Sequence, residues 1–305
     1  MREPDERIAK VGDVELAYEE LGDSDGEPLL LVMGLATQMI GWPEGFCEKL
    51  GERGYRVIRY DNRDIGHSTK LEDAGRPGRA AMLFGTGEPA YLLEDLADDA
   101  AGLLDFLGIE SAHVVGASMG GMIAQTLAIR HPEKVRSLAS IMSGPGSRWS
   151  RMPRLRALGT LMQSAPSERE AFVDHAVKTF SVIGSPGFER DEARLRETAA
   201  LSYDRSFHPP GVARQLHAIT ASPSRTRDLR EVKAPTVVIH GRNDPLVRLA
   251  AGRATARAVP GARFVVIDGM GHDLPEGAWD WIVDEVEANG RRAAKPEAAA
   301  APAAA

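Results

Sequence analysis

A serine, an aspartate and a histidine lie where this chain could assemble a nucleophile and its base. Ser118 lies in "VVGASMGG", with glycine two residues before it and two and three residues after it. Asp244 follows the apolar run "PTVVIHG", and His272 follows "RFVVID". A serine hydroxyl is a weak nucleophile alone and needs a base, and a histidine base needs an acid to fix its tautomer. The three residues therefore predict a Ser118–His272–Asp244 catalytic triad. Along the chain they follow the order serine, acid, histidine.

The glycines around Ser118 indicate a very tight turn. "HVVGA" reads as a strand and the residues after Ser118 as a helix, so G-x-S-x-G lies at a strand-to-helix turn. Side chains at Gly116 or Gly120 would clash where strand and helix meet. We expect a strained backbone at the serine, with its Oγ exposed above the sheet and the helix N-terminus behind it.

Two other aspartates compete with Asp244 for the role of acid. Asp268 ends its strand too early, and Asp273 adjoins His272 in sequence, which is a poor geometry for holding Nδ1. Asp244 and His272 each follow a strand directly, and parallel strands bring such positions to the same sheet edge. We therefore favour Asp244. The strand histidines, such as His113 and His240, are interpreted as packing residues.

Attack on a carbonyl also needs donors for the negative charge that develops on its oxygen. We expect the backbone N–H of Met119, the residue after the nucleophile, to be one donor. The N–H of Leu35 is the second candidate, because Gly34 permits a sharp turn after the strand "LLLVM". The charged loop "DNRDIGHS" (61–68) offers further polar groups, but we interpret Asp61, Arg63 and Asp64 as holding that loop together.

Short apolar runs and helical patterns alternate along most of the chain, which predicts a mostly parallel sheet covered on both faces. The expected strands cover 14–22, 28–34, 55–61, 111–118, 135–143, 235–241 and 262–268. The expected helices cover 43–53, 91–107, 119–130, 247–258 and 276–289.

Residues 146–228 break this alternation, since they contain helical patterns and no convincing strand. We predict an α/β core made of 1–145 and 229–290, with 146–228 as a helical cap or lid between them. The low-complexity tail 291–305 is expected to be disordered. We call 146–228 the insertion and expect it to cover Ser118. Some of its apolar side chains should line a pocket; the candidates are Trp149, Leu158, Leu161, Met162, Phe172, Phe180 and Phe207.

The composition excludes several classes of protein. A net charge of −7 argues against a general nucleic-acid binder, which needs a basic face. No apolar run approaches the roughly 20 residues of a membrane span, and the charged start lacks the pattern of a signal peptide. The single cysteine, Cys47, permits no intramolecular disulfide and no multi-cysteine metal site. We expect a cytoplasmic protein acting on a small molecule without metal or cofactor, and leave its oligomeric state open.

These motifs resemble the α/β-hydrolases over about residues 8–290. The landmarks are "RYDNRDIGHS", "VVGASMGGMIAQ", "PTVVIHGRNDPLV" and "GMGHDLP". Within that superfamily the chain looks like the bacterial esterases that include aclacinomycin methylesterase. The resemblance implies an α/β-hydrolase fold and hydrolysis of a carboxylic ester through an acyl-enzyme. In the loop that carries Leu35, many relatives have His-Gly where this chain has Met33-Gly34. The difference does not remove the proposed oxyanion donor, because that donor is a backbone N–H.

Other functions on the same fold stay open at this point. An acyl-homoserine lactonase or a thioesterase would use the same triad on another acyl group. A cofactor-free haloperoxidase or perhydrolase shares the triad as well. A non-catalytic ligand-binding protein is an alternative of a different class, against which an intact triad argues. The dehalogenase and epoxide-hydrolase branches place aspartate at the position of Ser118 and are excluded.

Overall fold

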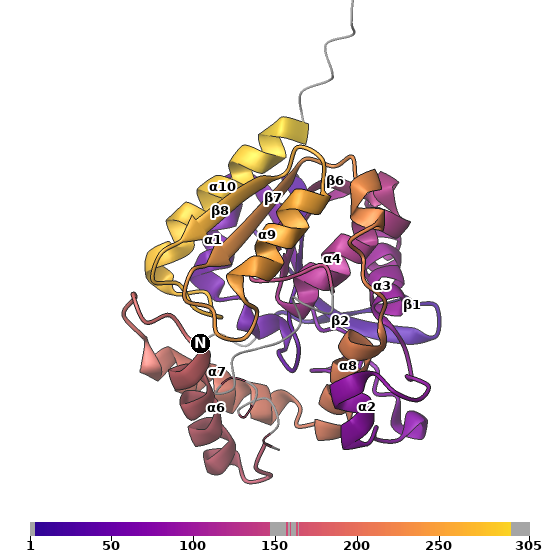
Figure 1. Cartoon of the computed structure of the whole chain (residues 1–305), viewed down its shortest axis with the longest axis vertical. Helices are drawn as coiled ribbons and strands as arrows, with labels where there is room; N and C mark the ends of the chain where they lie inside the picture. The colour runs from indigo at the N-terminus through magenta and orange to yellow at the C-terminus, as the bar shows by residue number, and fades with distance from the viewer. Residues whose placement is uncertain (1–3, 147–156, 158, 160–162, 164, 294–305) are drawn as a thin grey trace, which may run out of the picture.

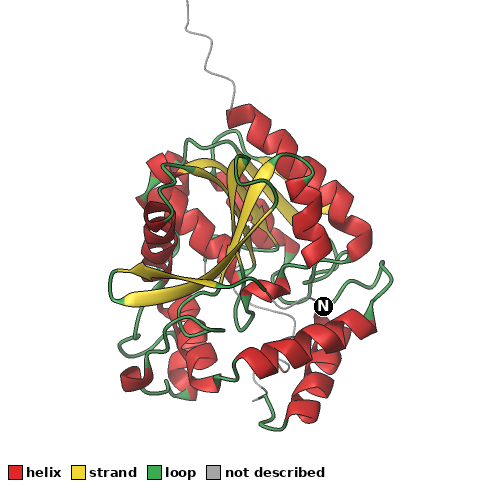
Figure 2. Ribbon diagram, turned by 180° about the vertical axis from the view of Figure 1, so that it is seen from behind, coloured by secondary structure: helices red, strands yellow, loops and turns green. Residues whose placement is uncertain are grey.

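A computed structural model of the chain describes residues 4–146, 157, 159, 163 and 165–293. These residues form one eight-stranded sheet with the order β1-β2-β4-β3-β5-β6-β7-β8, in which β1–β2 and β2–β4 are antiparallel and all other pairs parallel (Figure 2). The strands are β1 (Arg7–Val11), β2 (Val14–Leu21), β3 (Glu27–Val32), β4 (Tyr55–Tyr60), β5 (Ala112–Ala117), β6 (Val135–Ile141), β7 (Thr236–Gly241) and β8 (Arg263–Ile267). The predicted mostly parallel sheet is confirmed.

Helices cover both faces of this sheet (Figures 1 and 2). The core helices are α1 (Glu44–Gly51), α2 (Arg79–Phe84), α3 (Leu93–Phe106), α4 (Met119–Arg130), α9 (Leu249–Ala258) and α10 (Trp279–Ala293). Side chains of α3 and α4 pack in one apolar cluster, and those of α1 and α10 in another. Strand β3 contributes side chains to both clusters: Leu30 and Val32 to the first, and Leu29 and Leu31 to the second. This double burial is why its sequence is continuously apolar.

Three elements differ from the sequence-based expectation. The sequence does not predict strand β1, because "RIAKV" is partly charged. This segment is a strand because it pairs with β2 at the sheet edge. Helix α2 is not predicted either. Helix α10 extends to Ala293, three residues into the tail expected to be disordered, because Arg292 donates hydrogen bonds to Asn289 Oδ1 and to the carbonyl of Gly261. The rest of that tail lies outside the described residues.

The insertion contributes α6 (Arg169–Ile183), α7 (Glu192–Arg205) and α8 (Pro209–Ala221), and its described residues contain no strand. Helices α6 and α7 lie together at one end of the molecule, and α8 packs against α2 (Figure 1). Phe172 and Phe207 both pack on the ring of Tyr203, with centroids 5.6 and 5.3 Å away, so they belong to the internal packing of the insertion. Among the other apolar candidates for a pocket wall, Trp149, Leu158, Leu161 and Met162 lie outside the described residues.

Buried ion pairs join the insertion to the loop after β4. Arg205, the last residue of α7, donates to Asp61 Oδ2 at 2.9 Å, and Arg214 of α8 forms a bidentate pair with Asp64 at 2.6 and 2.8 Å. Arg63 pairs in the same way with Asp99 of α3. The loop charges are therefore structural, as the sequence indicates.

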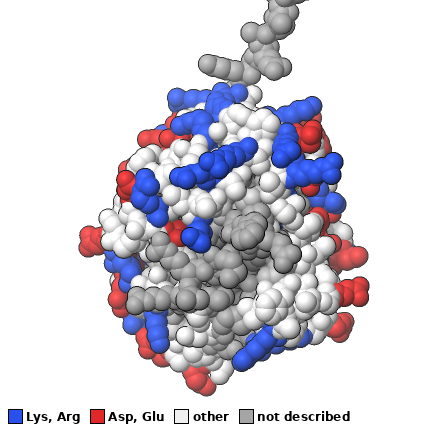
Figure 3. All heavy atoms as spheres, viewed as in Figure 1, with Lys and Arg blue, Asp and Glu red and all other residues white. Residues whose placement is uncertain are grey.

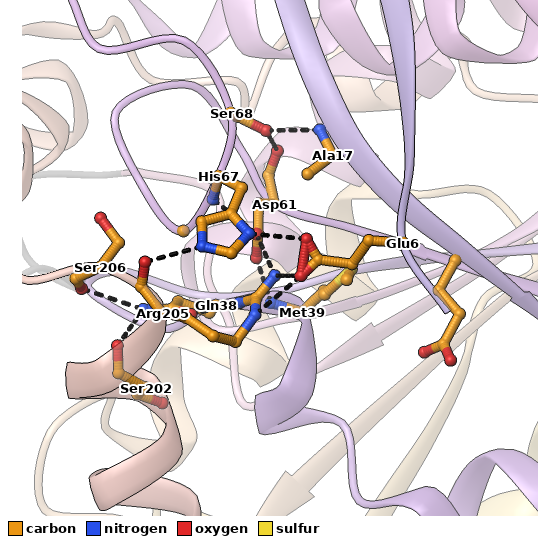
Figure 4. A network of polar contacts seen from close by, with 12 residues as sticks. Glu6, Ala17, Gln38, Met39, Asp61, His67, Ser68, Ser202, Arg205 and Ser206 are labelled. Atoms are coloured by element: carbon orange, nitrogen blue, oxygen red, sulfur yellow. Dashed lines mark hydrogen bonds and ion pairs between the residues drawn. The ribbon is translucent and has the colours of Figure 1, made fainter. Parts of the chain in front are cut away.

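Arg205 is the centre of the larger of these networks (Figure 4). Its guanidinium also binds Glu6, near the N-terminus, and the side-chain oxygen of Gln38. Gln38 in turn donates to the carbonyl of Ser202 at 2.7 Å. The His67 ring bridges Glu6 and the carbonyl of Arg205, both at 2.7 Å. The end of α7 is thus fixed from several sides at once.

Arg214→Met tests whether the buried pair stabilises the fold. The Arg214 side chain keeps the pKa of Asp64 below its usual value, although burial of the carboxyl acts in the opposite direction. Removing the guanidinium leaves a buried carboxylate without its partner, and we expect the free energy of unfolding in urea at neutral pH to fall by about 3–5 kcal/mol. Because the folded pKa is lowered, the contribution of Asp64 is present above its unfolded pKa of about 3.9 and is lost as the pH falls below it.

Arg169→Met is the matched control for that experiment. Arg169 makes an equally bidentate contact with Asp204, but both side chains lie on the surface of the insertion. Exposed pairs stabilise proteins little, so this variant should unfold close to the wild type. Equal losses in the two variants would contradict a special role for the buried pair.

Candidate active site

Ser118 occupies the strained turn that the glycine pattern predicts. It lies between β5 and α4 with φ 56° and ψ −119°, a backbone conformation rarely adopted by residues with a side chain. A Cβ atom at Gly120 would overlap the carbonyl oxygen of Val32 in β3, and one at Gly116 would overlap the carbonyl of Gly120. The structure therefore confirms that neither glycine position has room for a side chain. The turn directs Oγ toward the loops that follow the carboxyl ends of β7 and β8.

The structure brings Ser118, His272 and Asp244 together. His272 Nε2 lies 2.9 Å from Ser118 Oγ, and His272 Nδ1 lies 2.7 Å from Asp244 Oδ2. A carboxylate can only accept, so Nδ1 carries the proton and Nε2 is free to accept the proton of the serine hydroxyl. Asp244 is 2% exposed and His272 is 8% exposed, so water screens their interaction weakly.

Backbone groups hold Asp244 in place. Its Oδ1 accepts hydrogen bonds from the N–H groups of Leu246 and Val247 at 2.8 and 2.9 Å, which leaves Oδ2 for the imidazole. His240 supports the same loop from β7, because its Nε2 donates to the carbonyl of Val247 at 2.8 Å. Burial lowers the pKa of His240, although the nearby Asp244 carboxylate acts in the opposite direction. The sequence indicates a packing role for His240, and no local pattern marks its support of the acid's loop.

The two competing aspartates have other partners. Asp268 forms an exposed ion pair with Arg242, and the carboxylate of Asp273 accepts from Ser185. Among these three aspartates, all of them within the described residues, Asp244 is the one that contacts the imidazole.

The expected oxyanion donors lie on either side of Ser118. Met119 is the first residue of α4, and Leu35 follows Gly34 in the loop after β3. A Cβ atom at Gly34 would lie 3.1 Å from the Cβ of Ser118, so this loop runs directly beside the nucleophile. Within the described part of the chain, the N–H groups of Leu35 and Met119 have no hydrogen-bond partner. Both are therefore available to a bound oxygen.

The insertion supports this loop through Gln215 of α8. Its side-chain oxygen accepts from the N–H of Ala36 at 3.1 Å, and its side-chain nitrogen donates to the carbonyl of Arg63 at 3.1 Å. Gln215 is fully buried. Sequence reasoning missed this residue, because the contact joins positions 179 residues apart and no nearby motif marks it.

A second serine–histidine–carboxylate set lies at the other end of the strands, near the start of β5. His113 Nδ1 is 2.8 Å from Ser137 Oγ, and its Nε2 is 3.2 Å from Glu27. The Tyr55 ring packs edge-on against the imidazole, and Gly290 of α10 lies close beside it. Burial lowers the pKa of His113. His113 and Ser137 are both buried beneath these neighbours, which agrees with the packing role expected of His113.

The described surface and helices add three observations. On the face in Figure 3, basic side chains are most frequent in the upper part, and acidic side chains lie mostly along the left and right edges. No helix among the described residues is long and apolar enough to cross a membrane. The same residues contain no group of three or more histidine, cysteine or acidic side chains placed to hold a metal ion.

Comparisons with known proteins agree with this fold. The family model described as "alpha/beta hydrolase fold" matches residues 27–277. The chain is 32% identical over 291 residues to the rhodomycin D methylesterase DnrP of Streptomyces peucetius, which covers 88% of this chain and 92% of the relative. The rhodomycin D methylesterase DauP of Streptomyces sp. strain C5 has the same identity and coverage. A 2-hydroxymuconate semialdehyde hydrolase of Pseudomonas putida is 29% identical, over 81% of each chain.

Solved structures give the same fold at lower identity. The enol-lactonase from Burkholderia xenovorans LB400 superposes with a TM-score of 0.68 at 24% identity, covering 93% of this chain and 99% of that one. A thermophilic esterase from Thermogutta terrifontis gives 0.68 at 24% identity, covering 95% and 100%.

Gly120→Ala tests the close approach of β3 to the turn. The added methyl group would overlap the Val32 carbonyl, which cannot move without disturbing β3. We expect a loss of about 3 kcal/mol or more in the free energy of unfolding, or no folded protein at all. Gly78→Ala is the control, because a Cβ atom there meets nothing within 4 Å and its φ of −70° suits alanine. A stable Gly120→Ala variant would contradict the tight turn.

Proposed function

This chain belongs to the α/β-hydrolase family, and we propose that it hydrolyses a small-molecule carboxylic ester through an acyl-enzyme intermediate on Ser118. Family membership and the methylesterase relatives support ester hydrolysis. The observation that supports the finer proposal is the His272 imidazole, which contacts Ser118 Oγ at one nitrogen and the buried Asp244 at the other.

Acylation begins when Ser118 Oγ attacks the ester carbonyl and its proton moves to His272 Nε2. The carbonyl oxygen becomes an oxyanion, for which the N–H groups of Met119 and Leu35 are the proposed donors. Asp244 stabilises the imidazolium and keeps its orientation. The tetrahedral intermediate then collapses, the carbon–oxygen bond to the alcohol breaks, and His272 gives its proton to the departing alkoxide. The products of this half-reaction are the alcohol and an ester of Ser118.

Deacylation repeats these steps with water as the nucleophile. His272 takes a proton from water, and the hydroxide attacks the acyl carbon of the Ser118 ester. The second tetrahedral intermediate collapses with release of the carboxylic acid, and His272 returns the proton to Ser118 Oγ. No metal or cofactor takes part in this proposed cycle.

The insertion is proposed as the cap over this site. It runs from the end of β6 to β7, and its residues contact the loop of His272 and the loop of Leu35. A cap there would exclude water and shape a pocket for the acyl or alcohol group. Because the two methylesterase relatives act on methyl esters by name, methyl esters are the first substrates to test.

Substitutions in the relay test the mechanism. We expect Ser118→Ala and His272→Ala to lower kcat for a p-nitrophenyl ester by about 10⁴–10⁶, and Asp244→Asn to be severely impaired but milder than His272→Ala. Asp268→Asn removes the competing acid that pairs with Arg242 and should leave kcat unchanged. A folded Ser118→Ala protein with a tenth of the wild-type kcat would exclude the serine mechanism.

A substrate panel separates ester hydrolysis from the related reactions. We expect turnover of carboxylic esters, including methyl esters, to exceed turnover of an acyl-homoserine lactone and an acyl-CoA thioester in kcat/KM. Halide oxidation with peroxide should be weaker still. A covalent fluorophosphonate label on Ser118 distinguishes all of these from a non-catalytic binding protein. A kcat/KM highest for the lactone or the thioester would replace the ester proposal with that reaction.

A further inference from the structure

His272 lies on a loop whose position depends on the insertion. Residues 268–275 between β8 and the helical turn at 276 form no helix or strand, so their backbone groups need partners elsewhere. The end of α6 and the segment after it supply some of these partners, and Asn243 in the loop after β7 supplies others. The N–H of His272 donates to the carbonyl of Ile183 at 2.7 Å, and the N–H of Gly187 donates to the carbonyl of Gly269 at 3.0 Å.

Ser185 is the side chain at the centre of this contact. Its Oγ accepts from the N–H of Gly271 at 2.8 Å and donates to Asp273 Oδ1. Its backbone N–H donates to the other carboxylate oxygen of Asp273 at 3.2 Å. One serine thus holds the residues before and after His272, and it is 6% exposed.

The two backbones are in direct contact along this stretch. A Cβ atom at Gly271 would overlap the carbonyl of Gly184, and one at Gly187 would overlap Gly269. Small changes in the insertion must therefore reach the histidine loop, because no space separates them.

We propose that Ser185 and Asp273 are positioning residues that hold His272 in line with Ser118 and Asp244. This inference rests on the proposed function of the triad. The imidazole must keep contacts of 2.9 and 2.7 Å at its two nitrogens, although the loop that carries it has no regular structure. A displacement of about 1 Å in such a relay can lower the rate about 100-fold. Ser185 and Asp273 fix the backbone on both sides of the ring.

The charge of Asp273 adds an electrostatic effect. Burial raises the pKa of Asp273, and the bonds from Ser185 act against that rise by stabilising the ionised form. The charged and titratable groups that act on this carboxyl are His272, beside it on the loop, and Arg190 of the insertion. An ionised Asp273 favours the imidazolium that forms when Ser118 attacks.

Ser185→Ala, Asp273→Asn and the double variant test the proposal. In each of them we expect kcat for a p-nitrophenyl ester to fall between about 10- and 100-fold, while KM changes by less than about threefold, because the pocket stays and the base moves. The double variant should lose no more than the more affected single variant, because the two residues act as one hydrogen-bonded unit. In Asp273→Asn the acidic limb of the kcat/KM profile should also move to lower pH, because a negative charge near the imidazole is gone.

Controls separate positioning from a purely structural contact. Ser181→Ala and Asp174→Asn change the same residue types on α6. Ser181 Oγ donates to the carbonyl of Lys178, and Asp174 pairs with Arg196 on the surface. Both variants should keep wild-type kinetics. Rates are expressed per Ser118 that reacts to completion with a fluorophosphonate, which removes any effect of poor folding. If Ser185→Ala fails to fold, the near-isosteric Asp273→Asn decides alone.

The experiment distinguishes failure of the proposed function from failure of the positioning role. If Ser118→Ala, measured in parallel, keeps its activity, the proposed function itself is wrong. If Ser118→Ala is inactive but Ser185→Ala and Asp273→Asn keep the wild-type kcat and pH profile, the triad stands and the positioning role is overturned. The positioning role is overturned as well if these variants lower only the melting temperature.

Discussion

The site depends on one steric constraint, the contact between β3, β5 and the first turn of α4. Ser118 adopts a positive φ, a conformation that costs about 1–3 kcal/mol for a residue with a side chain. It persists because β5 pairs with β3 and β6 on its two sides, and because Gly120 lets α4 approach the carbonyl of Val32. The remaining groups are placed relative to this turn. The loops after β3, β7 and β8 all begin at the same sheet edge, which follows from the parallel direction of these strands.

The insertion takes part in this placement through two contacts. Gln215 contacts the loop that carries Leu35, and Ile183 contacts the backbone of His272. The insertion is itself fixed by Arg205 (Figure 4) and by Arg214, and each arginine has an aspartate partner in the loop after β4. Buried ion pairs are costly to desolvate, but breaking one leaves an uncompensated buried charge, so these pairs disfavour other orientations of α7 and α8. A well-defined insertion then gives well-defined loops on both sides of Ser118.

Much of the fold could be predicted because the strands are buried on both faces and therefore appear as short apolar runs between helical patterns. The positions of Asp244 and His272 directly after such runs indicated that they would lie near Ser118. Strand β1 could not be predicted, since a charged edge strand owes its structure to its partner β2. The roles of Ser185 and Gln215 could not be predicted either, because they contact residues 86 and 179 positions away in the chain. Local sequence patterns do not reveal contacts between such distant positions.

The arrangement of Asp61 and Asp64 has a consequence for how caps can be exchanged among related enzymes. These two aspartates, three residues apart on one core loop, each neutralise an arginine from a different helix of the insertion. An insertion transplanted from a relative would bring its own side chains to both carboxylates, and a mismatch would bury two uncompensated charges. The aspartate loop and the two arginines therefore form one exchangeable unit, although more than a hundred residues separate them in the chain. Recombination that seeks new specificity on this scaffold should transfer residues 61–64 together with the insertion, because a crossover between them breaks both pairs.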